Sequence, residues 1–281
     1  ELQIIWRDHN VEVPQSPVLT TPNGTTVNLA ASSVLGTPHL TSQSQPAGSG
    51  CAASTSNQTY DANSNVASKD DFNGTRSCYA YDLTRNLESA RVEGLANTTD
   101  CATVIPANSA LPAGSRRTST QWHPDWRFEA KRAGPGRITT LVYNGQPDPF
   151  AGNAIASCAP TGALLPDGKS IAVLCKQVEQ ATTDTNGSQG FSAALQSGVP
   201  NRQISWAYNQ FGQVLTEDGP RTDVSDITTY AYYADTTAEH TLGDLRSITN
   251  AVGNVTQYTK YNKHGQLLES IDSNGVLSVN T

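Results

Sequence analysis

Positive charge is scarce in this sequence. Its 281 residues include 18 Lys and Arg against 25 Asp and Glu, which gives a net charge of −7. A protein that binds nucleic acid needs a basic patch. The one basic cluster, formed by Arg116, Arg117 and residues 127–137, is interpreted as a solvated face. The composition therefore argues against a nucleic-acid partner.

Long apolar runs and helical patterns are also missing. No segment approaches the ~20 consecutive apolar residues that a membrane-spanning helix requires, so we expect no membrane span. Helical periodicity is nearly absent, and residues 190–197 are the only short helix candidate. Methionine does not occur, even at position 1. We interpret this absence as the mark of a processed product or an excised fragment.

Motifs for catalysis and metal binding are missing as well. The five cysteines form no Cys-x-x-Cys pattern, so zinc binding and haem attachment are not expected. The sequence has no Gly-x-Ser-x-Gly elbow and no His-x-x-x-His pair. His123 and Asp125 are the only neighbouring candidates for an acid–base pair. We therefore predict no enzyme, no metal and no cofactor.

The sequence does contain a degenerate Tyr-Asp motif that recurs about every 21 residues. It begins at Tyr60-Asp61 and again at Tyr81-Asp82. A fixed period of this size indicates a repeat architecture. Weaker copies begin at Tyr143, at Tyr208 (ending in Gly212) and at Tyr261 (ending in Gly265), and second turns between the copies contain Gly74, Gly253 and Gly275.

Each repeat is predicted to be a β-hairpin. The turns carry Asn, Asp or Gly, which tolerate positive φ or bond to their own backbone. Between the turns are short alternating runs rich in Thr, Tyr and Val, such as residues 228–232 and 255–259. Their period of two predicts half-buried strands. One hairpin cannot bury its apolar face alone, so we expect neighbouring repeats to stack.

Four longer strings extend this repeat pattern: YDANSNVASKDDFNGTRSCYAYDLTRNLES, TQWHPDWR, GQVLTEDGPRTDVSDITTYAYYADTT and YNKHGQLLESIDSNGV. Through them the chain resembles a segment of an Rhs-type, or YD-repeat, protein. The resemblance covers residue 38 to the C-terminus and is most specific in residues 212–276. It implies a secreted or surface protein of Gram-negative bacteria, in which many repeats form a β-sheet strip that spirals into a hollow shell, often around a C-terminal toxin.

Two features of the family are missing. The single Asp-Pro, at Asp148, is followed by Phe150 and Gly152, so the self-cleavage core that the resemblance would imply is absent. No toxin domain follows the repeats in this sequence. We therefore expect the terminal activity of full-length relatives to lie outside this chain.

The predicted fold is all-β. It is a YD-repeat strip of antiparallel β-hairpins, a solenoid-like or shell-like sheet with long inserted loops. Four segments are expected: residues 1–50, with strands at 2–7 and 25–30 and a Pro/Ser/Thr-rich stretch; residues 51–92, with YD repeats; residues 93–200, with loops inserted at 97–115, 147–169 and 184–200; and residues 201–281, with regular repeats truncated at the C-terminus.

An exported chain is expected to form disulfides. We expect Cys51 to pair with Cys78 across the first clear repeat, and Cys158 with Cys175 around a loop rich in Pro and Gly. Cys101 would then remain as a buried thiol or an intermolecular link. The sequence alone leaves the connectivity open.

Two local patterns are open to a second interpretation. Asp61, Asn63 and Asn65 are spaced like the start of a calcium loop, but Val66 occupies the position of the turn glycine, so a simple repeat turn is favoured. Residues 122–127 read Trp-His-Pro-Asp-Trp-Arg and are interpreted as a structural element. The alternative is a ligand surface formed by Trp122, Trp126, Tyr230 and Tyr232.

The predicted function is structural. The chain is expected to build an extracellular or cell-surface β-scaffold or shell in a bacterium, with neighbouring repeats of the same or identical chains as partners. A filament is one form that such an assembly could take. The alternative is a module that binds cell-surface glycans through exposed Tyr and Trp.

Overall fold

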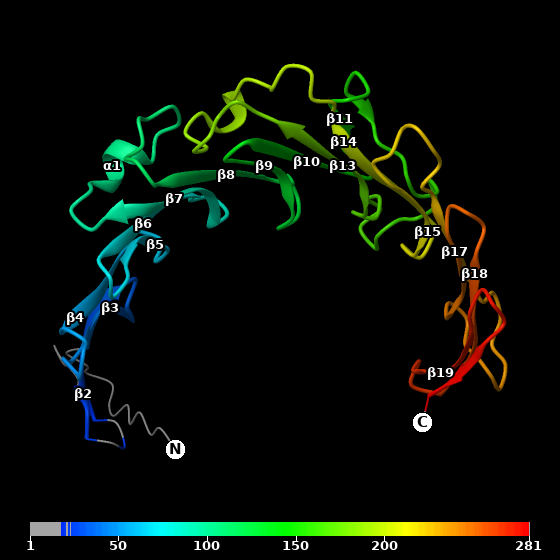
Figure 1. The fold of residues 1–281 in the computed structure, drawn as a ribbon, viewed down its shortest axis with the longest axis horizontal. Coiled ribbons are helices and arrows are strands. Elements are labelled where there is room, and N and C mark those ends of the chain that lie inside the picture. The colour runs from blue at the N-terminus through cyan, green and yellow to red at the C-terminus, as the bar shows by residue number, and fades with distance from the viewer. Residues whose placement is uncertain (1–17, 21, 23, 281) are drawn as a thin grey trace. The chain divides into compact units, whose positions relative to one another are not determined.

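The computed structural model describes residues 18–20, 22 and 24–280. Eighteen of its strands belong to one antiparallel sheet, and two more form a small hairpin. The all-β prediction is therefore confirmed (Figure 1). The strand expected at residues 25–30 is β2 (Thr26–Val34), whereas the strand expected at residues 2–7 lies outside the described residues.

The chain divides into two compact units, and the first contains the described residues up to Ile138 together with Thr182–Gln196. Each strand pairs with the next in antiparallel register, as in Asn57↔Asp70 between β4 and β5. The elements after β2 are β3 (Thr37–Gln45), β4 (Ser54–Tyr60), β5 (Val66–Asp70), β6 (Thr75–Asp82), β7 (Leu87–Ala96), α1 (Cys101–Val104), β8 (Arg116–Trp122), β9 (Glu129–Gly134) and the 3₁₀ turn η1 (Gly190–Ser192); β1 (Val18–Thr20) precedes them.

The second unit contains Thr139–Ala181 and the described part of Ser197–Thr281. From β13 onward each strand again pairs with the next. Its strands are β10 (Arg137–Tyr143, which starts in the first unit), β11 (Pro147–Asp148), β12 (Ala154–Ile155), β13 (Leu174–Ala181), β14 (Arg202–Tyr208), β15 (Val214–Asp218), β16 (Thr228–Tyr232), β17 (Leu245–Thr249), β18 (Val255–Tyr261), β19 (Leu267–Ile271) and β20 (Leu277–Val279).

The hydrophobic core of the first unit lies where inserted loops cover one face of the sheet. Cys78 on β6 and Val92 and Leu95 on β7 pack against Val104 of α1. Farther along, Ala133 and Ile138 pack against Ala193, just after η1. The helix expected at residues 190–197 is limited to this 3₁₀ turn. The insertions predicted from the sequence therefore supply the second layer of the core.

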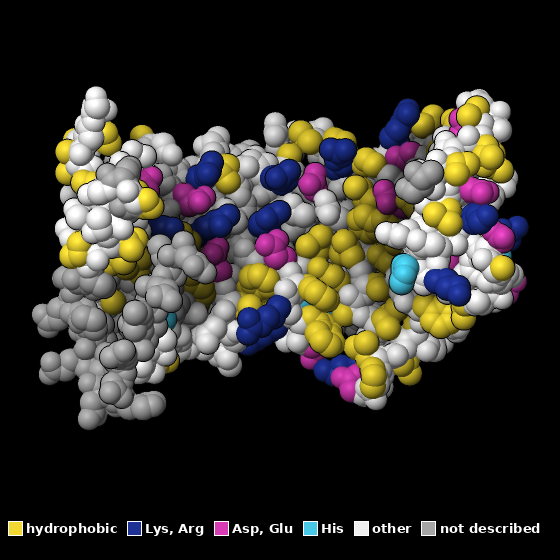
Figure 2. All heavy atoms as spheres, turned by 90° about the horizontal axis from the view of Figure 1, so that it is seen from below, with side chains coloured by type: hydrophobic (Ala, Val, Ile, Leu, Met, Phe, Trp, Pro, Cys, Tyr) yellow, Lys and Arg dark blue, Asp and Glu magenta, His cyan; other side chains and the backbone are white. Residues whose placement is uncertain are grey.

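The opposite face of β7, β8 and β9 is charged. Arg91 lies between Glu88 and Glu93 at 3.8 Å from each, and Arg116 lies 3.3 Å from Glu93. Figure 2 shows one face of the molecule, on which basic and acidic side chains are interspersed. Exposed pairs of this kind stabilise by ~1 kcal/mol or less. Within the basic cluster, Arg116 is paired in this way, and Arg132 lies 3.6 Å from Glu129.

The regular repeats of the second unit have a different character. From β14 to β20, no described residue is fully buried, and most strand side chains are half-buried. A single sheet layer of this kind buries little apolar surface on its own, so stability depends on strand pairing and on neighbouring strands.

Candidate functional site: the turns and the covering loops

Six hairpin turns share one hydrogen-bond pattern. The first residue is Asp or Asn, and its Oδ1 accepts the N–H groups of the residues two and four positions later, as at Asp71, where the distances are 2.9 and 2.8 Å. Its backbone N–H donates to the carbonyl of the fifth residue. The first residues of the six turns are Asp61, Asp71, Asn209, Asn250, Asn262 and Asp272.

The fourth residue of each turn explains the glycines of the repeat. It has a positive φ, which glycine adopts without strain. Gly74, Gly212, Gly253, Gly265 and Gly275 occupy this position with φ between 74° and 87°, and Ser64 occupies it in the first turn with φ 67°. Asp61 therefore caps a repeat turn, as the sequence favoured. Its Oδ2 accepts from Asn65 Nδ2 at 2.9 Å.

The N–H of Val276 holds the pKa of Asp272 below its ordinary value. A carboxyl group with a lowered folded-state pKa adds stability above its unfolded pKa and loses that contribution as the pH falls through the folded value. We expect Asp272→Asn to have the same melting temperature as the wild type at neutral pH, because Asn250 and Asn262 cap other turns of the same type. Below about pH 4, its melting temperature should fall less steeply. Equal acid sensitivity in thermal unfolding from pH 2 to pH 7 would contradict this prediction.

A second repeated contact lies at the end of five strand pairs. In each case an aromatic residue stands at a β-bulge in the pairing with the following strand, and the polar atom of its side chain donates to a carbonyl on the preceding strand. This carbonyl lies just beyond the end of the ladder, so the side chain replaces a missing backbone donor. The contacts, at 2.7–2.9 Å, are Tyr60–Leu40, Trp122–Glu88, Tyr208–Leu174, Tyr232–Val214 and Tyr261–Leu245.

Two of the four residues of the predicted ligand surface use their polar atoms in this contact, within the sheet. Trp122 and Tyr232 lie half-buried, with their polar atoms bonded to backbone carbonyls. Tyr230 is also half-buried, and burial raises its pKa. Burial raises the pKa of Tyr261 to about 12, so its hydroxyl keeps the proton that it donates. The sequence did not reveal that Trp122 occupies the position of the motif Tyr.

The expected disulfide between Cys51 and Cys78 is wrong. Cys78 pairs with Cys101, with 5.5 Å between the Cα atoms, and Cys51 is an exposed free thiol. The reason is that loop 97–115 folds back over β6 and β7. Asp100 caps α1 by accepting the Ala102 N–H, and this places Cys101 over the fully buried Cys78.

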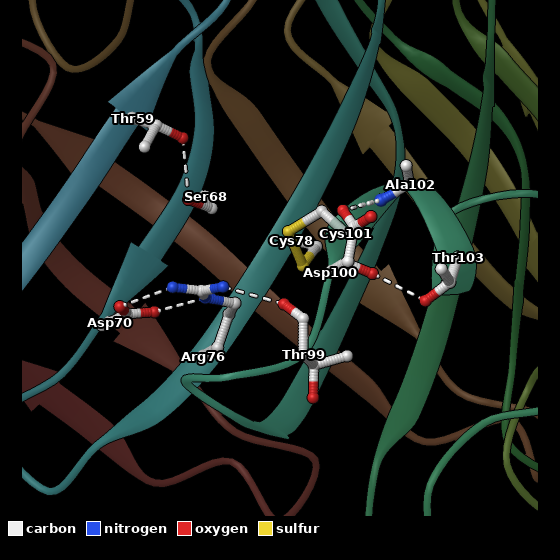
Figure 3. The surroundings of a disulfide bond; sticks show 10 residues. All are labelled: Thr59, Ser68, Asp70, Arg76, Cys78, Thr99, Asp100, Cys101, Ala102 and Thr103. Carbon is white, nitrogen blue, oxygen red and sulfur yellow. Dashed lines mark hydrogen bonds and ion pairs between the residues drawn. A yellow bond between two sulfur atoms is a disulfide. The ribbon is translucent and has the colours of Figure 1, made fainter.

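An ion pair lies beside this disulfide (Figure 3). Asp70 accepts from Arg76 Nε at 2.6 Å and from its Nη2 at 2.8 Å, and Arg76 Nη1 donates to the Thr99 carbonyl. The hydrogen bond to Asp70 raises the pKa of Arg76. The pair thus fastens the start of the covering loop to β5 and β6.

The second disulfide, between Cys158 and Cys175, is confirmed. It fastens the loop after β10 to β13. Asn144, in the third copy of the motif, supports the same loop by accepting from the Cys158 N–H and donating to the Ile171 carbonyl. Asp148 is buried and lies 2.5 Å from Lys176 Nζ, which places the Asp-Pro segment in a structural ion pair.

A second loop, residues 182–196, covers the sheet of the first unit and lies close against β8. The Arg117 N–H donates to the Asn186 carbonyl, and Gly187 approaches the Arg117 carbonyl so closely that a Cβ would lie 2.1 Å from its oxygen. Arg117 is only 5% exposed, in contrast to the solvated position expected from the sequence. Its guanidinium donates to Ser119 Oγ and to the Ile105 carbonyl, and burial lowers its pKa.

The turn between β8 and β9 is held by several hydrogen bonds and carries exposed aromatic rings. His123 is buried, and its Nδ1 accepts the N–H groups of Asp125 and Trp126. The hydrogen bond that joins the two neighbouring acid–base candidates, His123 and Asp125, is thus made by the Asp125 backbone N–H. Arg85, from the turn between β6 and β7, donates to the carbonyls of His123 and Trp126. Trp126 is 37% exposed and Phe128 is 43% exposed, with 6.4 Å between their ring centroids.

The connection between β16 and β17 brings together three polar residues that the sequence analysis did not single out. They are Asp235, Thr237 and His240, which lie within hydrogen-bond distance of one another in a chain. Among the residues that the structure describes, no group of three or more His, Cys, Asp or Glu side chains is arranged to hold a metal ion. No helix in the described part of the chain is long and apolar enough to cross a membrane.

No family model and no curated protein matches the sequence. Among solved structures, the chain is similar to the crystal structure of TcdB2-TccC3-Cdc42, with a TM-score of 0.46 and 12% identity over 94% of this chain and 12% of that one. The crystal structure of TcdB2-TccC3-TEV matches with a TM-score of 0.25 and 13% identity over 87% and 14%. The chain thus spans a small part of each, and at these identities the likeness concerns the fold alone.

Proposed function

We propose that the chain is a structural segment of an exported YD-repeat protein and that its strip of hairpins forms part of a β-walled scaffold or shell. The observation that supports this proposal most is the repetition of two hydrogen-bonded features. An Asx-type turn and an aromatic-to-carbonyl contact close successive hairpins in both units. Such units add in sequence and bury surface against their neighbours.

An extracellular or cell-surface location in a bacterium belongs to this proposal. The two disulfides support it, because disulfides persist mainly in oxidising compartments. The thin sheet from β14 to β20 supports a role in a larger assembly, because its half-buried strands would gain from pairing with further repeats of the same or identical chains.

The test is electron microscopy of the native protein, with its mass measured with and without reductant. A shell role predicts hollow particles much larger than one chain. A regular filament with a fixed axial rise would instead favour a polymer of identical chains joined through their strands. Discrete small particles without any larger assembly would contradict both forms of the proposal.

A second candidate function is glycan binding, which the exposed rings of the β8–β9 turn favour. Aromatic faces stack on sugar rings, and Arg85 already fixes the turn backbone. On this hypothesis, Trp126→Ala should abolish binding on a glycan array. Phe211→Ala serves as the control, because Phe211 is an exposed ring that lies outside the candidate surface. Absence of binding by the wild-type protein across the array would exclude this function.

A further inference from the structure

The connection between β16 and β17 holds a hydroxyl, an imidazole and a carboxylate in one chain of contacts. Thr237 Oγ1 lies 3.2 Å from His240 Nδ1, and His240 Nε2 lies 3.1 Å from Asp235 Oδ1. All three belong to residues 235–240, and their order resembles that of a nucleophile, a general base and its orienting acid.

The donors and acceptors fix the direction of each hydrogen bond in the neutral form of the imidazole. An ionised Asp235 can only accept, so Nε2 of His240 must carry the ring proton and Nδ1 must accept. Thr237 therefore donates its single O–H to Nδ1. The Glu239 N–H donates to Thr237 Oγ1 at 3.1 Å, which leaves the hydroxyl proton free for that bond.

The imidazole is held firmly in this orientation. The Tyr233 ring stacks on His240 with 3.5 Å between centroids and 13° between planes, and the Tyr233 hydroxyl is bonded to the Tyr258 carbonyl. The Tyr261 N–H donates to the Glu239 carbonyl and fastens the segment to β18. His240 is largely shielded, whereas Thr237 is exposed. A solvent-borne molecule can thus reach the hydroxyl while the base stays positioned.

We propose that Thr237 is a nucleophile for acyl transfer from small carboxylic esters, with His240 as its general base and Asp235 as the group that orients the imidazole. Thr237 Oγ bonds to the ester carbonyl carbon while its proton passes to His240 Nδ1. The carbon–oxygen bond to the alcohol breaks, and the Nδ1 proton passes to the departing oxygen. Water then attacks the acyl-threonine, gives one proton to Nδ1, and that proton returns to Thr237 Oγ as the carboxylic acid leaves.

The experiment treats the intact protein with p-nitrophenyl acetate and follows p-nitrophenol release, with peptide mass mapping of the acetylated residue. We expect acetylation at Thr237. The rate should fall at least about tenfold in His240→Gln and in Asp235→Asn, since a positioned base contributes ~10²–10⁴-fold. Thr237→Ser should retain acetylation, because it keeps the hydroxyl, whereas Thr237→Val should lose it.

The matched control is His264→Gln, which removes an imidazole from the exposed turn between β18 and β19. It should react like the wild type. Thermal unfolding of every variant separates a lost fold from a lost base, and Asp235 is exposed enough for its replacement to leave the fold intact. The proposal is overturned if the wild type is acetylated no faster at residue 237 than His240→Gln, or if the label maps only to other residues. Neither result bears on the scaffold role.

Discussion

Replacement of Gly187 by Ala is expected to detach the second covering loop of the first unit. Gly187 has φ +79°, and a Cβ there would lie 2.1 Å from the Arg117 carbonyl oxygen and 3.1 Å from its carbon. The neighbour is backbone of β8 and cannot move without breaking the Arg117–Asn186 hydrogen bond. The left-handed conformation alone costs about 1–3 kcal/mol in a residue with a side chain, so the total loss should exceed that range.

Gly114 offers a matched control in the same unit. It has φ +82°, but no atom lies within 4 Å of the position that its Cβ would take. Gly114→Ala therefore carries the conformational cost without the clash, and the difference between the two variants in denaturant unfolding measures the close approach. Hydrogen exchange of residues 182–196 should increase in Gly187→Ala alone. Equal destabilisation by both variants would show that the approach to β8 is not tight.

Removal of the Cys78–Cys101 disulfide is expected to have an effect of similar size. The bridge closes a 23-residue separation, for which loop-closure entropy gives about 3 kcal/mol. Cys78 is fully buried against Val92 and Leu95, so the double variant Cys78→Ala, Cys101→Ala should also loosen the core beneath α1. The free energy of unfolding, measured with guanidinium chloride, should fall by at least the entropic amount.

The free thiol supplies the control for this prediction. Cys51→Ala should leave the stability unchanged, because Cys51 is exposed and unbridged. Peptide mapping without reductant should recover Cys78 linked to Cys101. A Cys51–Cys78 peptide, or a large loss of stability in Cys51→Ala, would contradict the observed connectivity.

The part of the fold that could be predicted from the sequence is the part set by local chemistry. Asp71 and Gly74 form their turn within five residues, so the type of residue at each position was enough to place it. The alternation of β16 and β18 likewise predicted half-buried strands at the observed positions. Both signals act over distances shorter than one hairpin.

The existence of the loops could be predicted, but not their placement over the sheet, because the contacts that fix it join residues far apart in the chain. Arg117 and Asn186 are hydrogen-bonded although several strands separate them in the sequence, and Arg85 reaches Trp126 from another hairpin. No local pattern distinguishes a buried Arg117 from its exposed neighbour Arg116. The disulfide error had the same cause, since Cys101 reaches Cys78 only after loop 97–115 folds back over the sheet.

The aromatic-to-carbonyl contact holds a strand pair in register whether the segment that connects its two strands is long or short. Tyr208 closes the pair β13–β14, whose connection runs over residues 182–201, and Tyr261 closes β17–β18, whose connection is the short turn at Asn250. In both pairs the fastening lies at the end away from the connection. A foreign peptide could thus be grafted between such strands, and the register of the sheet would be held from the far side.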